Sequence, residues 1–231
     1  MGKYDTTRYN HNLNRAVLDV EGEFDVPIIR PVTELELPDT FVDFNYAVGH
    51  QSGAERQGVH FFLDDYRFER LWSNPDAYLQ MLQKYRVVLS PDFSTYTDWP
   101  LAVQIYNHWR KHWLGAYLQE KGCTVVPTIS WGDLTSHWWC FEGEPTDSVV
   151  AVGSRGSNAD AKTRGEFEAG FEAMVEQLHP SRVLAFGGHM DVFDRHPGLV
   201  ERVDDEYSKR LRKIAEDRKS KKNDVKEGID K

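Results

Sequence analysis

Long apolar runs, cysteine pairs and phosphate-binding glycine loops are all missing from this sequence. No stretch approaches the roughly 18 apolar residues that a membrane helix needs, and the first five residues lack the apolar segment of a signal peptide. Two cysteines in 231 residues cannot form a disulfide framework or a zinc site of their own. We therefore expect a cytoplasmic protein with no membrane contact.

Basic residues are also in deficit. The chain has 28 Lys and Arg against 37 Asp and Glu, a formal net charge of −9. Residues 201–231 hold 11 basic and 9 acidic side chains, which leaves −11 on the first 200 residues. An acidic body argues against broad, non-specific adhesion to nucleic acid. A narrow basic groove or a charged tail stays compatible with this balance.

The apolar content, in contrast, suffices for one large domain, because 40% of the residues are apolar and 13% are aromatic. Short runs rich in β-branched and aromatic residues predict strands that are buried on both faces. These runs are Val26–Val32, Phe41–Val48, His60–Leu63, Arg86–Ser90, Cys123–Ile129, Trp138–Phe141, Ser148–Gly153 and Arg182–Gly187.

Helical patterns separate the later runs. One begins after Asn74-Pro75, and a longer one runs from about Asp98 to Gly122 with apolar residues spaced by four. A third extends from about Thr163 to Leu178. Alternating strands and helices predict an α/β fold with a parallel sheet. We expect an irregular or trimmed (β/α) TIM-like barrel, with an open doubly wound parallel sheet as the alternative.

Three segments are expected along the chain. Residues 1–25 form a polar N-terminal arm, residues 26–200 form the α/β domain of catalytic type, and residues 201–231 form a charged C-terminal helix and tail. The charged tail is interpreted mainly as a solvated helix, with contact to nucleic acid or a partner as the alternative.

Polar residues follow several of the predicted strands, at the end where parallel α/β folds place their sites. Asp64 and Asp65 follow His60–Leu63, and the string Ser90-Pro91-Asp92-Phe93-Ser94 follows Val87–Leu89. A carboxylate held at such a point can act as a nucleophile or a general base. Asp92 is the first candidate for this role, and capping of a turn is the simpler alternative for Asp64 and Asp65.

Aromatic and glycine residues follow the remaining strands. Trp131 offers a flat face for stacking, and Gly153 with Arg155 could bring a backbone and a guanidinium to an anionic group. The last predicted strand is followed by a string of glycine and polar residues. This string contains Gly187, Gly188, His189 and Asp191.

These strings resemble an uncharacterised family found in bacteria and their phages. The resemblance rests on Phe62-Leu63-Asp64-Asp65-Tyr66, on Leu89–Ser94 and on Val125–Trp131, and it covers about residues 40–190. It implies no activity.

A fainter likeness is to queuine/tRNA-guanine transglycosylases, which are (β/α) barrels. The segment Val150–Gly153, a following helix and the segment His179–Gly188 are similar to the late barrel of those enzymes. The likeness implies exchange of guanine for a 7-deazaguanine through a covalent Asp–ribose intermediate. The family's Asp-Ser-Gly-Gly string and its cysteine-rich zinc site are absent here, so its nucleophile cannot be assigned by motif.

Together these patterns favour an enzyme that modifies bases by glycosyl transfer. The expected catalytic residues are Asp92, Asp64 and Asp191. The expected substrate-binding residues are Asp65, Ser90, Phe93, Ser94, Trp131, Gly153, Arg155, Gly187, Gly188 and His189. The expected partners are nucleic acid, DNA rather than RNA, and a 7-deazaguanine base, with no cofactor or metal and with a homodimer or a partner protein as possibilities.

Two other functions stay open at this point. One is a metal-dependent nuclease or hydrolase that uses Asp64, Asp65 and Asp92. The other is a non-enzymatic phage accessory protein that binds a nucleotide or a host protein.

Overall fold

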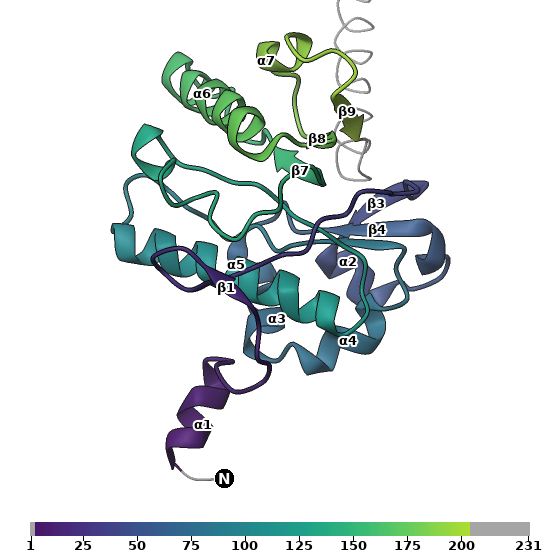
Figure 1. Ribbon diagram of the computed structural model, residues 1–231. Coiled ribbons are helices and arrows are strands. Elements are labelled where there is room, and N and C mark those ends of the chain that lie inside the picture. The colour runs from purple at the N-terminus through teal and green to yellow at the C-terminus, as the bar shows by residue number, and fades with distance from the viewer. Residues whose placement is uncertain (1–2, 204–231) are drawn as a thin grey trace, which may run out of the picture.

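The structure, a computed structural model, describes residues 3–203 (Figure 1). The predicted C-terminal helix and tail therefore lie outside the described residues, apart from residues 201–203. The helices are α1 (Lys3–Asn10), α2 (Phe44–Gly49), α3 (Glu69–Ser73), α4 (Asp76–Leu82), α5 (Leu101–Glu120), α6 (Ala161–Leu178) and α7 (Asp191–Asp194), with 3-10 turns at Ala54–Arg56, Asp65–Arg67 and Leu134–Ser136.

The strands form three sheets. They are β1 (Val20–Glu21), β2 (Val26–Pro27), β3 (Thr40–Asp43), β4 (Gln57–His60), β5 (Val87–Leu89), β6 (Val125–Val126), β7 (Val149–Gly153), β8 (Arg182–Phe186) and β9 (Val200–Val203). The antiparallel pair β1–β2 stands alone, whereas β3-β4-β5-β6 and β7-β8-β9 are parallel throughout. The predicted α/β class with parallel strands is confirmed.

The two parallel sheets meet just after β6. The amide of Ala151 donates to the carbonyl of Pro127 at 2.8 Å, and the amide of Ile129 donates to the carbonyl of Ala151 at the same distance. These bonds surround an isolated parallel bridge between Thr128 and Ala151. Among residues 3–203 no ladder joins β9 to β3, so a closed barrel stays a prediction.

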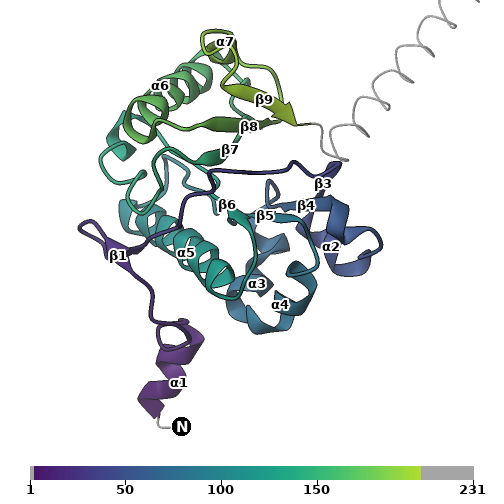
Figure 2. The same ribbon diagram turned by 45° about the vertical axis from the view of Figure 1, so that its right-hand side comes forward.

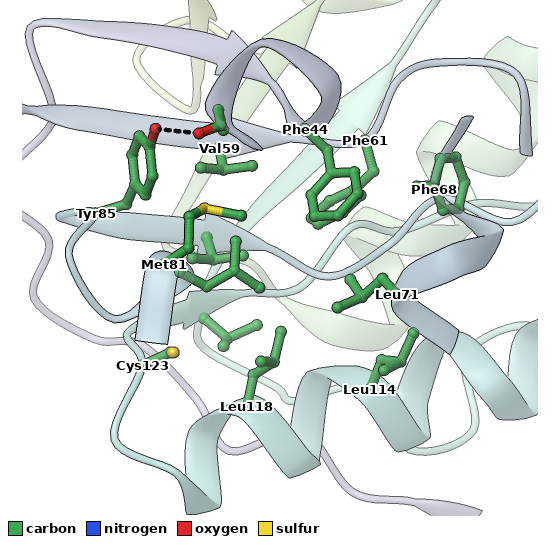
Figure 3. Packing of buried hydrophobic residues seen from close by; sticks show 14 of the residues in the cluster. Phe44, Val59, Phe61, Phe68, Leu71, Met81, Tyr85, Leu114, Leu118 and Cys123 are labelled. Atoms are coloured by element: carbon green, nitrogen blue, oxygen red, sulfur yellow. Dashed lines mark hydrogen bonds between the residues drawn. The ribbon is translucent and has the colours of Figure 1, made fainter. Parts of the chain in front are cut away.

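Three apolar clusters fix the layers. Phe44, Phe61 and Leu114 belong to a cluster between the β3–β6 sheet and helices α2–α5, shown in Figure 3. Met174 and Val183 belong to a second cluster between α6 and the β7–β9 sheet. Figures 1 and 2 show the same arrangement, with α6 and α7 beside β7–β9 and α2 to α5 around the first sheet.

The third cluster lies between the sheets. It contains Phe41 from β3, Leu89 from β5, Ala151 from β7, and Leu184 and Phe186 from β8. The rings of Phe41 and Phe186 meet edge to face with centroids 5.1 Å apart. Strands of both sheets therefore point alternate side chains into one common interior, and their carboxyl ends open on the same side.

Some predicted elements need correction. The run Phe41–Val48 is a strand only to Asp43, because the Asp43 side chain accepts from the Tyr46 amide and starts α2. The run Trp138–Phe141 is no strand, since the amides of Trp139 and Cys140 both bond to the carbonyl of Ser136.

Strand β9 was not predicted at all, because its burial is partial and its centre is charged. The N-terminal arm contains α1, which lies apart from the body of the molecule in both views (Figures 1 and 2). None of the helices within residues 3–203 has the length and apolar character that crossing a membrane requires.

Candidate active site at the strand ends

A cavity of about 600 Å³ opens at the carboxyl ends of β3 to β7, and it is called the strand-end cavity below. Each of these strands, together with the start of α6, contributes side chains to its wall. The contributing segments are Asp43, Phe62–Asp64 with Arg67, Asp92–Thr97, Ile129–Gly132, Gly153 with Arg155–Ser157, and Thr163 with Glu166 and Phe167. The volume is that of a site for a small organic ligand, which in proteins spans about 300–1,000 Å³.

The cavity brings together seven of the residues that the sequence singled out. They are Asp64, Asp92, Phe93, Ser94, Trp131, Gly153 and Arg155. Their common position follows from topology, because parallel strands end at the same edge and the residue after each strand faces the same opening.

Asp65 and Ser90 lie outside the lining and support it. The Asp65 carboxylate accepts hydrogen bonds from the Ser94 amide (3.1 Å) and from the Ser94 hydroxyl (2.8 Å). Ser90 is fully buried, and its hydroxyl accepts from the Thr128 amide at 2.8 Å. Asp65 therefore fixes the loop that carries Asp92, and Ser90 ties β5 to the chain after β6.

The residues after β8 are not among those that line the cavity. Gly187 has a φ of +96°, and a Cβ placed there would lie 2.8 Å from Ser154 Oγ, so the turn packs behind the β7 loop. His189 is exposed, with Nε2 3.1 Å from an Asp194 carboxylate oxygen. Gly188 is exposed, and the Asp191 side chain is 81% exposed. Neither His189 nor Asp191 shares the surface on which Asp92 lies.

The Asp92 carboxyl group is half-buried in the cavity wall. Burial raises its pKa to about 7, and the Asp65 carboxylate acts in the same direction. The Lys111 ammonium and a hydrogen bond with the Ser130 side chain oppose this rise in pKa. A carboxyl that titrates near neutrality can both donate and accept a proton under ordinary conditions.

Two guanidinium groups line the same cavity. Arg155 Nη1 donates to the carbonyl of Phe62 at 3.1 Å, which holds the side chain across the end of β4. Arg67 Nε lies 3.4 Å from an Asp64 carboxylate oxygen. The cavity therefore presents positive and negative groups together, as a polar and anionic ligand would require.

Trp131 forms part of the aromatic wall. Its ring packs against Phe167 of α6 with centroids 5.3 Å apart. Gly170 allows this approach, because a Cβ at that position would lie 2.1 Å from Trp131 Nε1. The ring is thus positioned by α6 while it borders the cavity.

A second polar group, missed by the sequence analysis, lies under α5. We call His108, Lys111, His112 and Glu144 the α5 cluster, and all four are buried. Lys111 Nζ donates to the Thr128 carbonyl at 3.0 Å and to Glu144 Oε1 at 2.7 Å. This helix was interpreted by its apolar residues spaced by four, and its polar residues were not considered as a site. Leu101, one of those apolar residues, is 48% exposed. The spacing of His108 and His112 by four on a predicted helix was the available signal.

Within residues 3–203, three side chains that could ligate a metal ion gather only in the α5 cluster, where ligand atoms of His108, His112 and Glu144 all lie within 4.8 Å of one another. Asp64, Asp65 and Asp92 form no such group in the strand-end cavity. The strand-end cavity therefore presents carboxyl groups for proton transfer and aromatic rings for stacking, but no cluster of three metal-ligand side chains among the described residues.

A family model described as a domain of unknown function, DUF4417, matches residues 18–202. The Gene 1 protein of Mycobacterium phage L5 is 34% identical over 196 residues, which cover 84% of this chain and 82% of the phage protein. The Gene 1 protein of Mycobacterium phage D29 is 34% identical over 187 residues, or 80% of this chain and 67% of the relative.

No solved structure matches this chain. The resemblance to an uncharacterised phage family is confirmed by these relatives. None of the findings supports the resemblance to tRNA-guanine transglycosylases.

Proposed function

This chain belongs to the DUF4417 family, and on that premise we propose that its strand-end cavity is the active site of a base-modifying glycosyl-transfer enzyme. The proposed reaction exchanges guanine for a 7-deazaguanine base in DNA or RNA. The observation that carries the proposal is the position of the Asp92 carboxyl, whose pKa burial raises to about 7, in the wall of an aromatic and polar cavity.

Base exchange needs a group that gives up a proton and takes it back. Protonated Asp92 donates its proton to the departing guanine as the bond between the anomeric carbon and the base nitrogen breaks. The resulting carboxylate then removes a proton from the incoming base. A pKa near the working pH suits both steps, because each protonation state is well populated.

A second carboxylate is needed at the sugar, and Asp64 is its candidate. Its side chain lines the same cavity, is 68% exposed and lies beside Arg67. In the proposed step an Asp64 oxygen bonds to the anomeric carbon as the electron pair of the broken bond passes to the base. The incoming base reverses this step and releases the carboxylate, as in retaining glycosidases.

The walls of the cavity suit a base and its sugar. Trp131, Phe62 and Phe167 offer aromatic surface, and stacking on such rings stabilises a base by about 1–3 kcal/mol. This stacking offsets part of the few kcal/mol that removing a base from a duplex costs. Arg67 and Arg155 line the same cavity, and a guanidinium is suited to contact a phosphate of the same nucleotide.

The test is incorporation of labelled base into nucleic acid. Guanine-containing DNA and RNA are incubated with the wild-type protein and radiolabelled guanine or 7-deazaguanine, and the label in the polymer is counted. We expect incorporation with the wild type and a loss of about 10²–10⁴-fold with Asp92→Asn. Asp39→Asn, which alters only an exposed ion pair with Arg56, is the matched control and should keep the wild-type rate.

Two outcomes would overturn the proposal. Wild-type protein that binds the free base without ever placing it in DNA or RNA would indicate a binding protein of the accessory kind. Equal rates for wild type and Asp92→Asn would show that the exchange does not use the strand-end cavity as described.

A further inference from the structure

The α5 cluster has features that hydrogen bonding within the protein does not account for. His108 Nε2 lies 2.9 Å from the carbonyl oxygen of Glu142, and His112 Nδ1 lies 3.0 Å from that of Pro27. A carbonyl oxygen only accepts, so each of these ring nitrogens must carry the proton. The other nitrogen of each neutral ring, Nδ1 of His108 and Nε2 of His112, is then a lone-pair donor.

Both rings lie close to a carboxylate, because one ligand atom each of His108, His112 and Glu144 lie within 4.8 Å of one another. His112 Nε2 lies 3.0 Å from Glu144 Oε1, so two acceptors face each other unless a cation or an added proton separates them. The second oxygen, Glu144 Oε2, is buried and has no hydrogen-bond partner among the described residues. An unpartnered carboxylate oxygen in the interior is costly, and Lys111 bonds only to Oε1, so Oε2 lacks a donor or cation of its own.

The arrangement matches the general chemistry of imidazole–carboxylate metal sites. Two histidines four residues apart on one helix face present their nitrogens to the same point, and a carboxylate completes the set. In such sites each histidine donates its second nitrogen to a backbone carbonyl or a carboxylate, which fixes the ring and its tautomer. Glu142 and Pro27 supply these carbonyls here.

A hollow lies beside the carboxylate of this group. It has a volume of about 300 Å³ and is lined by Glu144 together with Glu21, Glu142 and His137. Glu142 Oε2 and His137 Nε2 are buried there without hydrogen-bond partners among the described residues. The acidic lining attracts a cation and offsets the nearby positive charge of Lys111.

We propose that His108, His112 and Glu144 bind one divalent first-row transition-metal ion of the kind that prefers imidazole, such as Zn²⁺. The ion is a structural one, separate from the strand-end cavity. It links α5, which carries both histidines, to the segment before β7, which carries Glu144. Glu144 Oε1 stays with Lys111, and Oε2 is the oxygen free for the metal.

The test is metal uptake by the full chain. Protein freed of metal with a chelator is equilibrated with Zn²⁺, desalted, and analysed for zinc by mass spectrometry. We expect about one zinc per chain and a melting temperature that rises with zinc concentration. His108→Gln should weaken zinc binding at least about tenfold, and His11→Gln, a change at an exposed histidine, should leave it unchanged.

A second measurement covers the case in which a variant fails to fold. Wild-type protein loaded with Co²⁺ should show visible absorption bands of a nitrogen- and oxygen-ligated ion, and added Zn²⁺ should remove them. Chelator-treated wild type that takes up no zinc, or zinc bound equally by wild type and His108→Gln, would overturn the proposal. The α5 cluster would then be a network of buried hydrogen bonds and charges only.

Discussion

The strand-end cavity and the α5 cluster both gather ionisable side chains, but they differ in how those side chains meet water. In the cavity, Asp92 is half-buried and borders an opening of about 600 Å³. In the cluster, Lys111 and Glu144 are 1% and 0% exposed and bond to each other. The strand-end cavity therefore leaves a titrating group accessible to a ligand, whereas the charges of the α5 cluster pair with each other in the interior.

The two regions are also connected. Lys111 contacts Glu144 directly and opposes the rise in the pKa of Asp92 by its charge. Variants in the cavity should therefore change turnover and leave the fold intact. Variants in the cluster should change stability first and affect the cavity only through Lys111.

The largest effect is expected for catalysis. Asp92→Asn removes the proton donor but preserves the shape of the side chain, so kcat should fall about 10²–10⁴-fold. The melting temperature should stay the same or rise, because an amide is easier to bury than a carboxylate. Steady-state base exchange and thermal unfolding measure the two effects. A lower melting temperature with unchanged turnover would contradict a catalytic role for Asp92.

The next effect concerns stability. In protein freed of metal, Lys111→Met leaves the Glu144 carboxylate buried without a cation, which should lower the free energy of unfolding by about 3–5 kcal/mol. Lys84→Met removes an exposed lysine that bonds to Gln51, and it should change stability by less than about 0.5 kcal/mol. Urea unfolding compares the two.

A double variant sharpens this prediction. Lys111→Met combined with Glu144→Gln removes both charges and should recover part of the loss. If adding Glu144→Gln to Lys111→Met lowered the free energy of unfolding further instead of recovering part of it, Lys111 and Glu144 would not form the buried pair described.

The sequence could predict the positions of some of these residues but not of others. Asp64, Asp92, Trp131 and Arg155 directly follow apolar runs, so their shared location depends on strand order alone. His189 and Asp191 also follow a strand, but the turn at Gly187 packs against Ser154 and carries them elsewhere. That packing depends on contacts between distant loops, which local sequence does not encode.

The α5 cluster was hidden for a different reason. A helix that is buried on several sides has no single apolar face, and α5 buries His108, Lys111 and His112 beside its tryptophans. Periodicity identifies the helix but cannot show that polar residues on it will find Glu144, 33 positions after Lys111. Similarly, Asp43 turned a predicted strand into the start of α2 through one hydrogen bond.

A third prediction concerns pH and stability. The pKa of Asp92 is raised from 3.8 to about 7 in the folded protein, so the native state keeps a proton that the unfolded chain loses. The stability contribution is therefore fully present below pH 4 and is lost as the pH rises to about 7. The rise in pKa corresponds to at most about 4 kcal/mol of stability. The actual loss is smaller, because water in the cavity screens the charge.

The difference between wild type and Asp92→Asn isolates this group from all others that titrate. Urea unfolding of both proteins between pH 4 and 8 should show stabilities that diverge in favour of the variant as the pH rises. Parallel curves over that range would contradict a raised pKa.

The smallest effect is expected for ligand binding. Trp131→Ala removes one stacking surface and should weaken binding of guanine by about 1–3 kcal/mol, or roughly five- to 150-fold. Trp138→Ala is the matched control, because Trp138 is 54% exposed and does not line the strand-end cavity. Isothermal titration with guanine compares them, and equal affinities would remove Trp131 from the site.

The most direct test of the account is the titration of Asp92 itself. Protein labelled with ¹³C at aspartate carboxyl carbons is titrated by NMR, and the Asp92 resonance is identified by its absence in Asp92→Asn. We predict a midpoint near pH 7 for this resonance. A midpoint near 4, the value of an ordinary aspartate, would contradict the account, because Asp92 would then be ionised throughout and could not donate the proton that the proposed exchange requires.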